Sequence, residues 1–229
     1  MTVVARSLFR IYRPIIVWFW CTVAVVAAVG TAVLAQVAEV KLSLWIIIAG
    51  HGLKWWLLVI GVMLVATHFK LYLANGVTRR DFLLGAGVFG AITAVGYAAM
   101  VPIGHGVEWL VWTAFGGPPE SYPAFSAAGA VREFGHLLPA ALGWLVSGAL
   151  ITAGFYRFRW WAGLLLLVPA ALPLAVTDAL LGIFGPEDTP SARVLPYAAG
   201  LTVSLLLTAA GTAAFYLQMR DVAVARTAG

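Results

Sequence analysis

Hydrophobic residues fall into six long runs along the chain, separated by short segments that are richer in charged residues, glycine and proline. Each run reaches the roughly 20 residues that an α-helix needs to cross about 30 Å of hydrocarbon. The alternating pattern of a membrane β-barrel does not occur. Because a backbone in lipid must satisfy its own hydrogen bonds, the pattern predicts an all-α, polytopic membrane helix bundle. The six predicted spans cover residues 14–36, 44–69, 83–104, 137–156, 160–184 and 195–218.

Composition supports the membrane assignment. Of the 229 residues, 62% are hydrophobic and 10% are charged, and the mean hydropathy is +0.97. Soluble domains average about 25% charged residues, so this chain has too much apolar surface to bury in water. The length predicts a single transmembrane domain over residues 1–229.

The distribution of basic residues predicts the orientation of the spans. If the N-terminus is inside, the inner segments hold ten Lys or Arg residues, the outer segments hold three, and Lys54 lies within a span. This asymmetry predicts a multi-pass protein of the cell membrane with both termini in the cytoplasm. The net charge of +5 is therefore explained by topology in the lipid bilayer, and no nucleic-acid partner is expected.

The segment 2–13, ahead of the first span, has an amphipathic pattern. Arg6, Arg10 and Arg13 recur at helical spacing on one face, and apolar residues fall on the opposite face. The pattern predicts a short interfacial helix on the inner leaflet. The alternative is a basic anchor without regular structure.

The inner segment 70–82 contains signals for a turn followed by a new helix. Asn75-Gly76 is typical of a turn, Thr78 can cap the next helix, and Asp81 lies in its first turn, where the helix dipole favours an acid. On the outer side, residues 105–136 form the longest predicted loop. An apolar stretch within this loop, residues 107–115, is too short to cross the membrane and could be a re-entrant or surface-lying helix, and residues 126–133 could form another short helix. The loop is either a cap over an outer vestibule or an ordinary structured loop.

Two charges are predicted to lie inside the membrane. Lys54 falls near the middle of the second span and Asp178 in the outer half of the fifth, at depths that differ by roughly 6 Å. Buried ionisable residues usually pair or line a wet cavity, so we hypothesise that the two face each other or share a polar pathway with His51. The alternatives are a purely structural pair, or a Lys54 side chain that extends toward the membrane surface.

Motifs for chemistry are absent from the sequence. It contains no phosphate-binding Gly-x-x-x-x-Gly-Lys loop, no His-Glu-x-x-His metal helix and no serine-nucleophile elbow, and Cys21 is a single cysteine. We therefore expect no enzyme activity, no metal and no cofactor in this chain.

The layout resembles a type-2 ABC-transporter permease. The resemblance rests on the six N-in spans, the basic segment Arg6–Arg13 and the inner run 74–82, which is similar to a Gly-x-Ser/Thr-Arg-Arg-x-Phe run of small permeases. It implies a pair of permease subunits, identical or different, that exports a compound by using ATP and Mg through a separate ATP-binding subunit. It also implies that the inner loop is the coupling helix that docks on this subunit, formed by Asn75, Gly76, Val77, Thr78, Arg79, Arg80, Asp81 and Phe82.

The long outer loop departs from the family pattern, in which the elaboration often lies between spans five and six. Apolar spans favour an amphiphilic cargo such as a drug, peptide or lipid. The alternative function is a non-transport membrane protein: an assembly factor, a sensor or an immunity-type scaffold.

Overall fold

The computed structural model describes residues 3–37, 43–120, 122–181 and 195–222, apart from the side chains of residues 37, 51 and 53. All regular structure in these segments is helical. The second span is one continuous helix, Leu44–Ala74, with two π-helical segments, η1 and η2. The elements are α1 (Val3–Val37), α2 (Leu44–Ile47), η1 (Ile48–Gly52), α3 (Leu53–Met63), η2 (Leu64–Phe69), α4 (Lys70–Ala74), α5 (Arg79–Ala114), α6 (Ala127–Arg157), α7 (Trp160–Leu181) and α8 (Tyr197–Arg220).

The predicted all-α membrane fold is confirmed at the level of helix number and length. The described part of the chain contains six helices that are long and apolar enough to cross a membrane, and each includes one of the predicted spans or most of it. The outer end of the predicted fifth span, beyond Leu181, lies outside the described residues.

Much of the predicted loop over residues 105–136 is helical, in agreement with the short helices considered within it. Helix α5 continues to Ala114 and α6 begins at Ala127, so only the short stretch between them lacks helical structure. The helix continues because residues 105–114 contain no helix breaker apart from a tolerated glycine. It ends before Gly116 and Gly117, which have φ values of +111° and +97°. Ser126 then caps α6 by accepting a hydrogen bond from Gly129 N–H at 3.0 Å.

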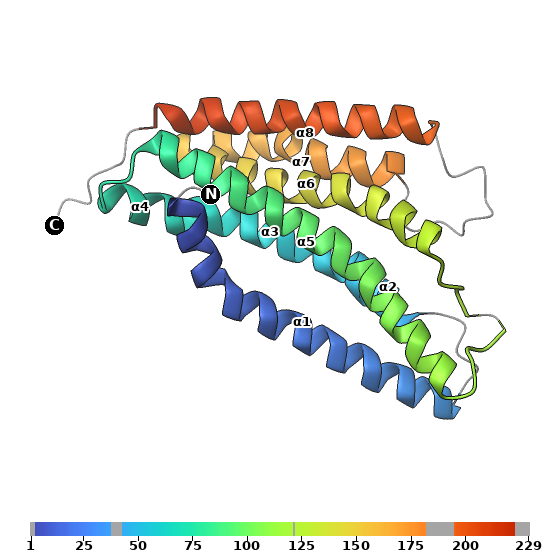
Figure 1. Cartoon of the computed structure of the whole chain (residues 1–229). Coiled ribbons are helices and arrows are strands. Elements are labelled where there is room, and N and C mark those ends of the chain that lie inside the picture. The colour runs from blue at the N-terminus through green and yellow to red at the C-terminus, as the bar shows by residue number, and fades with distance from the viewer. Residues whose placement is uncertain (1–2, 38–42, 121, 182–194, 223–229) are drawn as a thin grey trace.

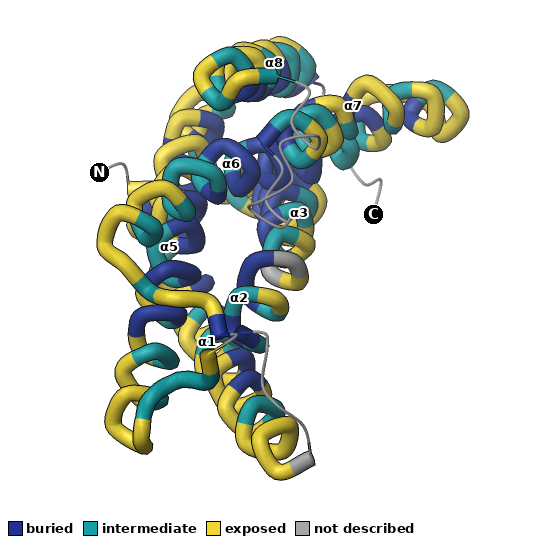
Figure 2. The backbone as a smooth tube through the Cα atoms, turned by 90° about the vertical axis from the view of Figure 1, so that its right-hand side faces the viewer, coloured by how far each residue is buried: buried dark blue, intermediate teal, exposed yellow. Residues whose placement is uncertain are grey.

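Helix α6 is the centre of the bundle and contacts α3, α5, α7 and α8. Figure 2 shows it as the most buried helix, enclosed by neighbours whose outward faces are exposed. Its buried stretch is rich in small residues, which allow other helices to approach closely. The small residues of this stretch are Ala140, Ala141, Gly143, Ser147, Gly148, Ala149, Ala153 and Gly154.

Two glycines bring the backbones of α6 and α3 close together. A Cβ atom on Gly148 would collide with the carbonyl oxygen of Leu58, and a Cβ atom on Gly61 would collide with the carbonyl oxygen of Leu145. A rigid backbone atom cannot move aside as a flexible side chain does. Both positions therefore require glycine while the two helices stay at this separation.

The contact between α6 and α7 uses a serine and a proline. Pro173 has no N–H group and disturbs the regular hydrogen bonding of α7. The N–H of the next residue, Leu174, donates instead to Ser147 Oγ of α6 at 3.2 Å. Ser147 is fully buried, so its hydroxyl joins the two helices.

Helix α1 lies at the edge of the bundle, bends in its N-terminal part and diverges from α3 and α6 (Figure 1). The bend agrees with the presence of Pro14 inside the helix. It contacts α5 and α2, for instance through the stacked rings of Trp20 and Trp45, 5.8 Å apart. Most of its apolar side chains face outward, as expected for a helix that contacts lipid.

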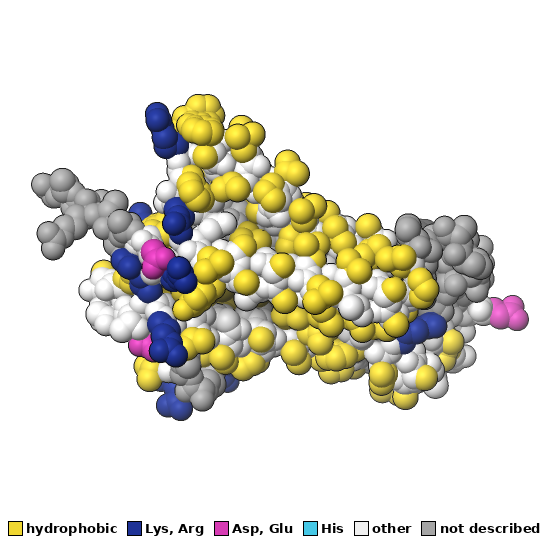
Figure 3. Space-filling model, turned by 90° about the horizontal axis from the view of Figure 1, so that it is seen from above, with side chains coloured by type: hydrophobic (Ala, Val, Ile, Leu, Met, Phe, Trp, Pro, Cys, Tyr) yellow, Lys and Arg dark blue, Asp and Glu magenta, His cyan; other side chains and the backbone are white. Residues whose placement is uncertain are grey.

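Both described ends of the chain and the turn after α4 lie at the same end of the bundle (Figure 1). Most Lys and Arg side chains on the face seen in Figure 3 gather at this end, while a hydrophobic band covers the middle. An even number of spans between the two ends accounts for their position on one side.

We predict that Gly148→Ala destabilises the protein and that Gly87→Ala does not. An added methyl at position 148 meets the backbone of α3, and overpacking of this kind costs about 1–3 kcal/mol. An added methyl at position 87 meets no atom within 4 Å, and alanine has the higher helix propensity. Thermal unfolding in detergent, followed by tryptophan fluorescence, measures both variants, and equal melting temperatures would contradict the α3–α6 contact.

Candidate functional site

The two predicted intramembrane charges form an ion pair. Lys54 Nζ of α3 lies 2.6 Å from Asp178 Oδ2 of α7. The Lys54 and Asp178 side chains retain 12% and 27% of their accessible surface, so the pair is only partly buried in this chain. The contact offsets part of the cost of placing ionisable groups at this depth.

Trp144 of α6 completes the site. Its indole N–H donates to the second carboxylate oxygen of Asp178 at 3.2 Å, and Lys54 Nζ lies 5.3 Å from the centre of its ring. The same ring packs edge-to-face on Trp55, with centroids 4.6 Å apart. One aromatic side chain thus contacts both charges and fixes the carboxylate orientation.

Sequence analysis missed Trp144, although a signal was present. Trp side chains in membrane proteins concentrate at the interfaces, and Trp144 lies well inside the predicted span 137–156. A buried indole N–H requires an acceptor, so a Trp at this depth indicates a polar partner nearby.

A π-helical segment precedes Lys54 and is held by a third helix. Regular hydrogen bonding of the backbone is altered in η1, and the Tyr97 hydroxyl of α5 donates to the carbonyl oxygens of Ala49 and Gly50, each at 3.1 Å. Segments of this type often occur at functional sites because they re-aim the following side chains. The backbone of His51 lies in this segment, but its side chain lies outside the described part, so its predicted place in the polar pathway stays a prediction.

The predicted inner loop forms a compact turn between α4 and α5. Gly76 has a φ of +82°, which favours glycine, and Asn75 Nδ2 donates to the Leu71 carbonyl at 2.7 Å. Thr78 caps α5 as predicted: its Oγ1 accepts from Asp81 N–H at 3.1 Å and donates to Asp81 Oδ2 at 2.7 Å. The turn is therefore ordered by its own side chains.

One of the eight residues predicted to contact a partner is in the wrong place for that role. Phe82 is fully buried and packs against the rings of Phe69 and Tyr72, at centroid distances of 5.4 and 5.5 Å. It anchors the start of α5 instead. Exposed positions in the loop include Asn75, Gly76, Thr78, Arg80 and Asp81, and Val77 and Arg79 are half-buried.

The basic segment 2–13 is not a separate helix, because α1 is continuous from Val3 to Val37. Arg6, Arg10 and Arg13 are exposed, as the pattern predicts. The apolar face packs on protein: Tyr12 is buried, and its ring lies 5.1 Å from that of Phe89 on α5. The bend at Pro14 makes this packing possible, since it turns the first helical turns toward the bundle. An additional contact of this segment with the inner leaflet remains a prediction.

A polar cluster at the end of the bundle opposite the two described chain ends joins α1, α2 and α5. The carboxylate of Glu108 accepts hydrogen bonds from Thr31 at 3.3 Å and from Ser43 at closer range. Burial, together with the nearby Glu108, raises the pKa of Tyr122, so this phenol stays neutral at physiological pH. The cluster links helices at this end of the bundle and was not foreseen, because its members are far apart in sequence.

Within the described segments, no group of three His, Cys, Asp or Glu side chains lies close enough together to hold a metal ion. No family model, curated protein or solved structure matches the chain. The function must therefore be argued from the residues themselves.

We predict that reversing the two intramembrane charges together is better tolerated than changing either one alone. Lys54→Asp places two acids in contact and Asp178→Lys places two bases in contact, whereas the double variant restores opposite charges. Each single change is expected to cost on the order of 1–3 kcal/mol, because the pair is only partly buried. The yield of monodisperse protein and the melting temperature measure the effect, and a double variant no better than the singles would contradict the pair.

Proposed function

We propose that the protein is the transmembrane permease subunit of an ATP-driven transporter that resembles type-2 ABC exporters. Two such subunits, identical or different, surround one pathway in the cell membrane, with their termini in the cytoplasm. A separate ATP-binding subunit supplies ATP and Mg, and this chain is not itself an enzyme. The cargo is an amphiphilic compound such as a drug, peptide or lipid.

The observation that carries the proposal is the inner turn at residues 75–78, which is exposed, ordered and continuous with the site in the membrane. Lys54 lies within the second span, and Asn75 directly follows the end of that span. The two residues are about 30 Å apart along the helix axis. A force applied to the turn is therefore applied to α3 and α5 as well. This is the mechanical property that a coupling element needs.

Chemical features of the turn suit protein docking. Arg80 and Asp81 are exposed neighbours. The Arg80 guanidinium offers charged hydrogen-bond donors, and the Asp81 carboxylate offers charged acceptors. The Thr78 cap and the buried Phe82 hold them on a fixed helix end, so little conformational freedom is lost on binding. A groove with acidic residues at its rim, on an ATP-binding subunit, would bind Arg80.

The tight packing of α6 bears on where cargo would pass. Its backbone contact with α3 and its hydroxyl contact with α7 hold these helices close to α6 and favour a path outside the single bundle. The pathway of the proposed transporter therefore runs between two subunits. The partly exposed Lys54–Asp178 pair can present a polar group to an amphiphile there.

The same packing also favours the second candidate, a non-transport membrane scaffold or sensor. A closely packed interior with a satisfied ion pair requires no cargo. Association with an ATP-binding subunit separates the two functions, because a scaffold has no need of one.

We expect a tagged form of this chain to co-purify with an ATP-binding subunit encoded beside it and co-expressed. Gly76→Pro, which cannot adopt a φ of +82°, and Arg80→Glu, which reverses an exposed charge, should each reduce recovery at least fivefold. Arg159→Glu reverses an exposed charge near a different inner turn and serves as the matched control.

Membrane insertion of every variant is checked by size-exclusion chromatography. Recovery that is equal in all variants would place docking outside the turn. Absence of a complex with the wild-type chain would contradict the permease and leave the scaffold.

A further inference from the structure

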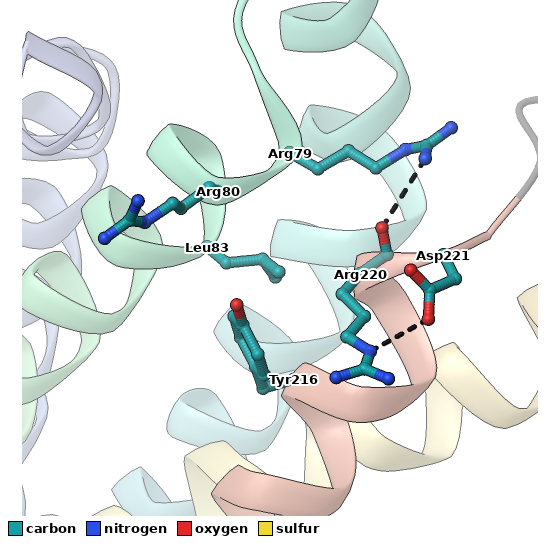
Figure 4. Close-up of a pocket in the computed structure, with 6 residues that line it drawn as sticks. All are labelled: Arg79, Arg80, Leu83, Tyr216, Arg220 and Asp221. Atoms are coloured by element: carbon teal, nitrogen blue, oxygen red, sulfur yellow. Dashed lines mark hydrogen bonds and ion pairs between the residues drawn. The ribbon is translucent and has the colours of Figure 1, made fainter.

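A pocket lies at the inner end of the bundle, where the start of α5 meets the end of α8 (Figure 4). Its volume is about 500 Å³. Its walls combine three arginines with one acid and two large side chains: Arg79, Arg80, Arg220, Asp221, Leu83 and Tyr216. Of these six residues, the proposed docking of an ATP-binding subunit uses only Arg80.

The arginines leave a net positive charge with free donors. Arg220 bonds Asp221 through Nε at 2.8 Å, which leaves its two terminal nitrogens available. Arg79 reaches the Arg220 carbonyl at 3.5 Å through a single nitrogen. Arg80 forms no ion pair or hydrogen bond through its side chain in the described part of the chain, and it extends to the opposite side of the pocket from Arg79 (Figure 4). Three arginines and one aspartate thus line the pocket.

The start of α5 adds to the positive potential. The first N–H groups of a helix have no partner within it, and the dipole favours an anion there. Asp81 and Thr78 satisfy part of this potential on the other side of the cap. The arginine side chains and the start of α5 therefore both favour the binding of a phosphate group.

Apolar side chains continue from the pocket along the outer face of the same helix. Leu83 and Tyr216 form its floor, and Leu84, Val88 and Ile92 follow on α5 with 52%, 38% and 47% of their surface exposed. These side chains lie at helical spacing and face outward, as acyl-chain contacts do. A basic pocket directly at the end of a lipid-facing apolar stripe is suited to a headgroup and its chains.

We propose that this pocket binds the phosphate of an anionic phospholipid from the inner leaflet. The headgroup contacts Arg80 and Arg220, and the acyl chains lie along α5. The proposal does not depend on transport or on an ATP-binding subunit. The pocket arginines would bind the lipid even if an ATP-binding subunit docks at another part of the chain. Soluble phosphate shares the headgroup chemistry but lacks the chains.

The test is native mass spectrometry of the detergent-purified full chain, titrated with phosphatidylglycerol or with phosphatidylcholine. The wild-type chain should bind phosphatidylglycerol at least tenfold more tightly than phosphatidylcholine. The double variant Arg80→Gln/Arg220→Gln should lose at least fivefold of this preference. Arg159→Gln removes an exposed inner-end arginine outside the pocket and should change it less than twofold.

Three results would overturn the proposal. One is an unchanged preference in the double variant while its melting temperature matches wild type. Another is an equal loss in Arg159→Gln, which would indicate a general surface charge effect. The third is displacement of phosphatidylglycerol by millimolar inorganic phosphate, which would make the ligand a soluble phosphate. If the double variant fails to fold, Arg80→Gln alone takes its place, because the Arg80 side chain is exposed and has no partner in the described segments.

Discussion

The backbone contact between α3 and α6 is the constraint on which the other features depend. Lipid provides little hydrophobic force between helices, so close packing and hydrogen bonds must hold them together. Gly61 and Gly148 permit that approach, and Ser147 joins α6 to α7 through a backbone hydrogen bond. Since Lys54 belongs to α3 and Asp178 to α7, a central helix held tightly to both places the two charges in contact.

The second span then links two environments with different chemistry. Its middle carries Lys54 beside a buried tryptophan and a carboxylate, and its inner end leads into a capped turn with exposed polar side chains. The π-helical segments η1 and η2 lie on either side of α3. Such segments can change register at lower cost than a regular helix, which gives span two defined points at which to bend. In the proposed transporter, span two would be the part that moves.

The sequence predicts the number of spans, the turn at Gly76 and the Thr78 cap, because each depends on local pattern alone. The contact of Lys54 with Asp178 followed from the cost of isolated charge in lipid. Within 105–136 the sequence indicates short helices but not that they continue the neighbouring spans as α5 and α6 do. The roles of Phe82 and Trp144 were missed because both depend on helices remote in sequence, and no local pattern encodes such packing.

The position of α6 is tested most directly by a disulfide in intact membranes. A Cβ atom on Gly154 of α6 would lie 3.6 Å from the Cβ atom of Leu166 on α7, within the range of disulfide geometry. In a Cys21→Ser background, Gly154→Cys/Leu166→Cys should oxidise readily to an intramolecular bond. Gly96→Cys/Leu166→Cys should not, because a Cβ atom at position 96 meets nothing within 4 Å. Failure of the first pair, or equal oxidation of both, would contradict a bundle built around α6.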